Sequence, residues 1–223
     1  MFLAAVARPR YDANRKRIFD GKIGIWPFVE KSPVKRKSKN RAKGTLVTKS
    51  VSVDSAVYTD MILNKVVPAI IQTFPTAALK NGVKVQQDNA SPHKAVTTEF
   101  LQSQGVNGIA MVNQPPNSPD YNVLDLGFFN SIQSLQHQKS NLNIDELISA
   151  VETSFYELPV EILSKTFITL QKVMELSMEV HGSNNYKLPH LQKDSTIKNF
   201  STFRVDCSSV IFDSALNQLN SLS

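Results

Sequence analysis

The chain has 223 residues, of which 41% are hydrophobic and 20% are charged, a composition typical of a soluble globular protein that excludes a disordered or fibrous one. No apolar run approaches the roughly 20 residues of a transmembrane helix, and no basic segment opens the chain as in a signal peptide, so we expect no membrane partner. The single cysteine, Cys207, excludes an internal disulfide and a cysteine-based zinc site and indicates an intracellular, reducing compartment.

The net charge of +6 is distributed unevenly along the chain. Residues 1–50 contain 14 Lys and Arg against 3 Asp and Glu, whereas residues 51–223 contain 11 against 16. The positive charge is densest from Lys31 to Lys49, a stretch with eight basic residues and no acidic one. Such a block forms either a solvated loop or a surface for a polyanion, of which nucleic acid is the commonest.

Two β-prone stretches, residues 2–10 and 22–31, open the chain. The polar segment between them contains the turn-forming residues Asn14 and Gly21, so an antiparallel hairpin is predicted. The basic segment 32–45 follows and contains Pro, Gly and Ser without any periodicity. This composition predicts a loop.

Helices and two short strands make up the rest of the predicted fold. Apolar residues recur at helical spacing from about Ser55 to Phe74, with Pro68 placed to kink that helix. Asn143 and Glu146 have the spacing of a helix-start capping pair. Periodicity and turn residues predict strands at 83–88 and 109–114, and helices at 92–104, 123–138, 143–158 and 160–180. This order of strands and helices indicates an α/β layer architecture.

Two acidic residues occupy positions where functional acids are common. Asp88 ends the predicted strand 83–88, and the ligands of open α/β sheets gather at the carboxyl ends of strands. Asp125 lies in the first turn of the predicted helix 123–138, after a proline-rich loop. Each acid also has a purely structural interpretation, because Asp88 with Asn89 readily forms an Asx turn and Asp125 would complement the helix dipole.

Two strings surround these acids, QQDNASPHK (86–94) and PPNSPDYNVLDLGFF (115–129). They resemble the second and third acid motifs, D-N-x-x-P-H and S-P-D-x-N-x-x-D, of mariner-like DDE/D transposases of the plant and oomycete type. Asp88 matches the second acid, and Asp125, not Asp120, matches the third acid 37 positions later. The resemblance covers about residues 1–195, and two long motifs in the correct order make it specific.

The resemblance implies a ribonuclease-H-like fold, in which helices flank a mixed sheet. The catalytic core would span residues 1–142, C-terminal helices 143–195 and a weakly structured tail 196–223. The implied reaction is DNA strand cleavage and transfer in the nucleus by a two-metal mechanism, with Mg²⁺ or Mn²⁺ held by Asp88 and Asp125. The implied partner is DNA, and the intact parent is expected to be a homodimer.

Neighbours of the second acid are further candidates for the site. Asn89 would either reinforce the turn or lie in the outer shell of the metal. His93 would orient a carboxylate, contact phosphate or close the turn with a hydrogen bond. Trp26 and the pair Phe128-Phe129 are assigned to the hydrophobic core rather than to stacking on bases.

The chain also departs from the family pattern. In the family, the first acid lies on a central strand upstream of the strand that matches residues 2–10, and paired helix-turn-helix modules precede that strand. We therefore expect this chain to lack the first strand and its acid, and to be inactive alone. Either a truncated remnant of a mobile element or a fragmentary gene model would explain why this strand and its acid are missing.

The alternative function is that of a non-catalytic protein that binds nucleic acid without regard to sequence. The basic segment would then supply the phosphate contacts, or act as a nuclear import signal. The residues assigned to this role are Arg36, Lys37, Lys39, Arg41 and Lys43.

Overall fold

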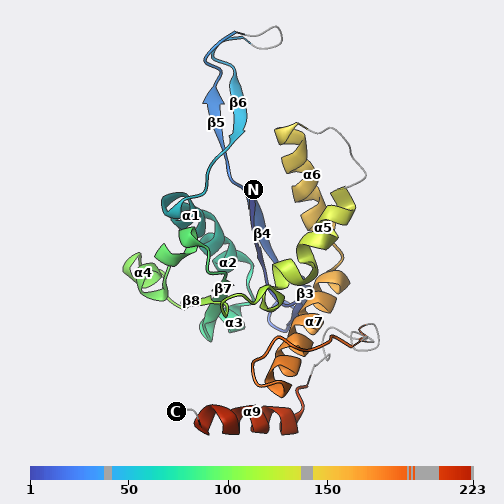
Figure 1. Cartoon of the computed structure of the whole chain (residues 1–223). Coiled ribbons are helices and arrows are strands. Elements are labelled where there is room, and N and C mark those ends of the chain that lie inside the picture. Colours follow the sequence, from blue (N-terminus) through green and yellow to red (C-terminus); the bar gives the residue numbers. More distant parts are fainter. Residues whose placement is uncertain (38–41, 137–142, 190, 192, 194–205, 222–223) are drawn as a thin grey trace. The chain divides into compact units, whose positions relative to one another are not determined.

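The computed structural model describes residues 1–37, 42–136, 143–189, 191, 193 and 206–221 (Figure 1). The chain divides into two compact units, each built from three stretches of sequence. The first unit comprises Met1–Ala7, Lys22–Asn113 and Ile132–Glu157, and the second comprises Arg8–Gly21, Gln114–Ser131 and Leu158–Ser223.

The N-terminal strands form the predicted antiparallel hairpin. In the first unit, β1 (Phe2–Val6) pairs with β4 (Lys22–Pro27), and Ala5 lies opposite Gly24. The connecting segment belongs to the second unit and is itself a small hairpin of β2 (Arg10–Asp12) and β3 (Arg17–Phe19). Its turn is closed by the Asp12 carboxylate, which accepts hydrogen bonds from the two backbone amides of Asn14 and Arg15.

The basic segment is more ordered at its ends than the predicted loop. β5 (Val29–Pro33) pairs antiparallel with β6 (Leu46–Ser50), and the pairing continues through the bond from Val34 N–H to Thr45 O, 2.9 Å. The prediction of a loop over 32–45 is therefore wrong at its start, where Ser32 and Pro33 belong to β5. Its middle is rich in Lys and Arg, but β-branched residues such as Val34 and Thr45 flank it and favour strand pairing.

The predicted helix over residues 55–74 consists of three helical pieces in series. They are α1 (Ser55–Met61), a π-helical turn (Ile62–Val66) and α2 (Val67–Thr73). The Asp54 side chain caps α1 by accepting the Val57 N–H at 2.9 Å. Pro68 lacks a backbone N–H, and the wider turn directly before it accommodates the proline without ending the helix. A short helix, α3 (Thr76–Lys80), follows.

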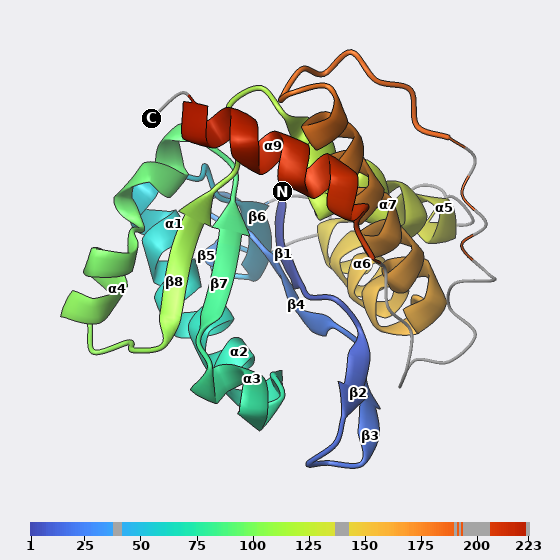
Figure 2. The same ribbon diagram turned by 90° about the horizontal axis from the view of Figure 1, so that it is seen from below.

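The two remaining strands form a parallel pair, β7 (Val83–Gln87) and β8 (Ile109–Asn113), shown side by side in Figure 2. The crossover between them contains a 3-10 helix (Ser91–Ala95) and α4 (Thr98–Ser103). One continuous helix over 92–104 was predicted, and this prediction is wrong. The backbone is extended at Thr97, whose hydroxyl caps α4 by accepting the Phe100 N–H at 3.1 Å.

The fold belongs to the mixed α/β class, as predicted. Among the described strands, hydrogen bonding gives four two-stranded ladders, which are β1–β4, β2–β3, β5–β6 and β7–β8. Apolar residues of β4, α1, the π-helical turn, α2, β7, α4, β8 and α6 (Ile144–Glu157) form the core of the first unit. The start of α6 is the predicted capping box, in which Asn143 and Glu146 exchange two hydrogen bonds of 2.9 Å.

Helices dominate the second unit. A 3-10 turn (Pro119–Tyr121) and a π-helical turn (Leu124–Phe128) lead into α5 (Phe129–Gln136), and α7 (Val160–Glu179) packs against both turns. Phe128 and Leu163 are fully or almost fully buried in this packing, so the assignment of Phe128 to the core is confirmed. The chain leaves α7 through Gly182, which has the positive φ of 83° that the predicted helix exit requires.

The C-terminal segment ends in a helix, α9 (Ser209–Ser221), which packs against α7. The expectation of a weakly structured tail is therefore wrong for residues 209–221. Ile211, Ala215 and Gln218 recur at helical spacing and are the partly buried residues of α9, so one face of this helix is partly covered. Within the described residues, no helix is both long and apolar enough to span a bilayer.

Candidate functional site

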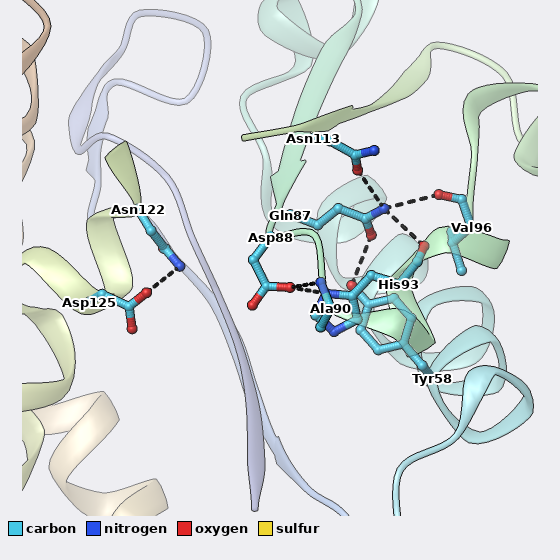
Figure 3. A network of polar contacts seen from close by, with 9 residues as sticks. All are labelled: Tyr58, Gln87, Asp88, Ala90, His93, Val96, Asn113, Asn122 and Asp125. Carbon is cyan, nitrogen blue, oxygen red and sulfur yellow. Dashed lines mark hydrogen bonds and ion pairs between the residues drawn. The ribbon is translucent and has the colours of Figure 1, made fainter. Parts of the chain in front are cut away.

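Asp88 directly follows the last residue of β7, and its side chain is 43% exposed. Its Oδ1 atom accepts the Ala90 N–H at 2.9 Å and lies 2.5 Å from Nδ1 of His93 (Figure 3). The Asx turn and the histidine contact therefore occur together. Among the described residues, neither a hydrogen bond nor an ion pair reaches Oδ2, so this oxygen remains available to a ligand.

Tyr58 of α1 stacks on one face of the His93 ring. The two rings are stacked, with centroids 3.9 Å apart and an interplanar angle of 28°. Tyr58 is 3% exposed, and burial, followed by the negative charge of Asp88, raises the pKa of its hydroxyl well above the ordinary value. The hydroxyl therefore stays protonated at neutral pH and donates a hydrogen bond to Gln87 Oε1, 3.1 Å away.

Gln87 is a member of this cluster that the motif comparison does not single out. Its side chain is 8% exposed, and its Nε2 amide donates toward three oxygens, those of the His93 and Val96 carbonyls and the Asn113 side chain (Figure 3). A sequence signal did exist. Successive side chains of a strand point to opposite faces, so Val83, Val85 and Gln87 share one face of β7. Gln87 is therefore a polar residue at an inward-facing position.

Asp125 lies on the π-helical turn of the second unit and is exposed. Its Oδ2 atom accepts the Asn122 side-chain amide at 2.8 Å, and Asn122 Oδ1 accepts the Leu124 N–H at 3.0 Å (Figure 3). Asn122 therefore forms an Asx turn before the π-helical turn and contacts Asp125 at the same time. Asp120, the acid not assigned to the site, instead accepts a hydrogen bond from the hydroxyl of Tyr186.

The two candidate acids belong to different units, Asp88 to the first and Asp125 to the second. Both are carboxylates, the oxygen ligands that Mg²⁺ and Mn²⁺ accept, so the donor chemistry fits the implied ions. Within the described part of the chain, no cluster of three His, Cys, Asp or Glu side chains has the arrangement of a metal site. Asn89, the other candidate beside Asp88, is exposed in the turn.

Three of the five candidate residues for nucleic-acid binding lie in the described part of the β5–β6 region. Arg36, Lys37 and Lys43 are all exposed and follow or precede the paired strands. Lys39 and Arg41 lie outside the described residues. Among the described residues, positive charge therefore lies at the end of the two-stranded ribbon formed by β5 and β6.

Neither the models of protein families nor the curated protein sequences contain a match to this chain.

Proposed function

We propose that the chain is part of the catalytic domain of a mariner-like DDE/D transposase, whose reaction is DNA strand cleavage and transfer. The observation that carries this proposal is the placement of Asp88. It follows the carboxyl end of β7, in a parallel strand pair, within the string that resembles the second acid motif of the family. The carboxyl ends of parallel strands are the common location of ligand sites in α/β proteins.

The order of the elements supports a ribonuclease-H-like interpretation of the fold. The antiparallel pair β1–β4 precedes the parallel pair β7–β8 in the chain, α4 lies in the crossover, and further helices follow. Among the described strands, hydrogen bonds do not join these two ladders. A ribonuclease-H-like sheet would require a further, central strand between them.

The chemistry of the two acids supports the proposed reaction. Two divalent ions about 4 Å apart stabilise the attacking and leaving oxygens of an in-line displacement at phosphorus. Asp88 would bind such an ion through Oδ2, because the Ala90 amide and His93 already engage Oδ1. Asn122 would orient the Asp125 carboxylate for binding an ion within the second unit.

Binding of Mn²⁺ tests the proposal directly. We expect Mn²⁺ to broaden amide resonances around Asp88 and around Asp125 in ¹⁵N–¹H NMR spectra, because a paramagnetic ion relaxes nearby nuclei. Asp88→Asn should remove the first effect and Asp125→Asn the second. Asp213→Asn, an isosteric change at an exposed residue of α9, should remove neither. Broadening that persists in Asp88→Asn would contradict the assignment of Asp88.

Incubation with plasmid DNA and Mn²⁺ tests the cleavage reaction itself. Only two of the three acids of the family match positions in this chain, so we expect weak Mn²⁺ binding and intact plasmid DNA after incubation. Plasmid cleavage that disappears in Asp88→Ala would support the proposed reaction and refute the expectation that this chain is inactive alone.

A second candidate function, non-catalytic binding of nucleic acid, is favoured by the β5–β6 ribbon. Exposed lysine and arginine residues flank the paired strands, and Lys31 and Lys49 extend the positive charge along them. A two-stranded ribbon is narrow enough to enter the major groove of duplex DNA. Contacts to phosphate alone would bind DNA without regard to its sequence.

Salt dependence tests this second function. Five productive phosphate contacts should give a slope of roughly −4 to −5 for log K against log salt, because each contact releases counterions. Replacing the five candidates by alanine should remove most of that slope, and two duplexes of unrelated sequence should bind equally. The charge-matched control replaces five exposed lysines elsewhere, namely Lys65, Lys80, Lys84, Lys94 and Lys187. Equal slopes in both variants would show that the basic segment is only a solvated loop.

A further inference from the structure

The Gln87 side chain ties the end of β7 to the segment that carries His93. Its amide nitrogen donates toward the carbonyl oxygens of His93 at 3.1 Å and Val96 at 3.2 Å, which lie at either end of the last turn before α4. It also donates toward Asn113 Oδ1 at 3.1 Å, at the end of the neighbouring strand β8. An NH₂ group has only two hydrogens, so these three acceptors share them. The backbone at His93 is thereby fixed to both parallel strands.

Tyr58 fixes the same histidine from the side of α1. Its hydroxyl donates to Gln87 Oε1, and its ring stacks on the His93 ring. Gln87 is thus satisfied at both ends of its side-chain amide, and both Gln87 and Tyr58 are buried. Buried polar groups that are fully satisfied in this way favour one arrangement over its alternatives.

We propose that Gln87 and Tyr58 are positioning residues that hold His93 against Asp88. Gln87 fixes the backbone of His93 and Tyr58 fixes its ring, so Nδ1 remains beside Asp88 Oδ1. Asp88 then presents its other oxygen, Oδ2, to the cation. The role of Oδ2 rests on the proposed function, whereas the positioning of His93 is a property of the first unit by itself.

The stacked rings provide a spectroscopic readout that needs no activity. At fixed neutral pH, the ring protons of His93 should resonate upfield of the other histidines, because the ring current of Tyr58 shields them. In Gln87→Met, which keeps the size of the side chain but removes all its hydrogen bonds, we expect this upfield displacement to shrink by at least half. The Mn²⁺ concentration that half-broadens resonances around Asp88 should rise severalfold.

Two further variants make the test specific. Tyr58→Phe keeps the stacked ring and removes only the bond to Gln87 Oε1, so both readouts should change in the same direction by a smaller amount. Gln102→Met makes the same chemical change at an exposed position of α4 and should change neither readout. Dispersed amide resonances identify the variants that remain folded.

The outcomes separate the two proposals. An unchanged His93 shift and unchanged Mn²⁺ broadening in folded Gln87→Met would overturn the positioning role. If Gln87→Met does not fold, Tyr58→Phe decides, and unchanged readouts in that variant overturn the role equally. If the wild-type chain shows no Mn²⁺ broadening near Asp88 but Gln87→Met still reduces the His93 displacement, the proposed function fails while the positioning role is supported.

Discussion

Replacing Phe155 by alanine is expected to lower the free energy of unfolding by about 3 to 5 kcal/mol. Phe155 lies in α6 and is 0% exposed, and α6 packs against β4 and β6 in the first unit. Removing the ring leaves a cavity that a close-packed interior fills only in part, so lost burial and the cavity both contribute. Guanidinium unfolding followed by far-UV circular dichroism measures the loss.

The adjacent residue provides the control for this prediction. Tyr156 is 64% exposed, and its ring meets the edge of the Phe155 ring with centroids 5.1 Å apart. Tyr156→Ala removes a side chain of similar size but loses mainly this edge contact, so we expect a cost below about 1.5 kcal/mol. Equal costs at the two positions would show that burial of Phe155 does not stabilise the unit.

Elements with a strong local signal could be predicted from the sequence. The capping box of Asn143 and Glu146 appears as expected, because capping side chains act within a few positions. The strand pair β1–β4 also appears as expected, because both of its strands are β-prone apolar stretches. The predicted loop over 32–45 is wrong at its start, because Ser32 and Pro33 pair with Val47 and Leu46 of β6, and the polar composition of the segment does not indicate this pairing. The crossover helix is interrupted because Thr97 caps a new helix, a choice that propensity alone does not reveal.

The position of Asp88 at the end of a strand could be predicted from the sequence, whereas the contacts that Gln87 and Tyr58 make could not. Asp88 follows a strand and His93 lies beside it, and short motifs identify both positions. Gln87 and Tyr58 escape such motifs, since they are 29 positions apart and meet only after α1 packs against the crossover. Tyr186 similarly reaches Asp120 across 66 positions. Long-range contacts of this kind follow from packing, which a single sequence does not show.

Gly24 is the position where the fold of the first unit depends on the absence of a side chain. It lies in β4 two positions before Trp26, so both residues face the same side of the strand. A Cβ atom on Gly24 would lie 2.3 Å from Cζ2 and 2.5 Å from Cη2 of the Trp26 ring. Those distances are far inside van der Waals contact, so the ring folds back over the strand only because residue 24 is glycine.

Gly24→Ala is therefore expected to displace Trp26 and to lower the free energy of unfolding by about 1 to 3 kcal/mol, the usual cost of overpacking. Trp26 is the only tryptophan of the chain, so a red shift of its fluorescence emission reports the displacement.

In a Trp26→Leu background the obstacle is gone. There the same Gly24→Ala change should be neutral, or stabilising by up to about 1 kcal/mol, because alanine restricts the unfolded chain more than glycine does. Unfolding of the four proteins of this cycle, followed by circular dichroism, measures the coupling between the two positions. A cost of Gly24→Ala that is the same in both backgrounds would mean that the tryptophan ring is not what excludes a side chain at residue 24.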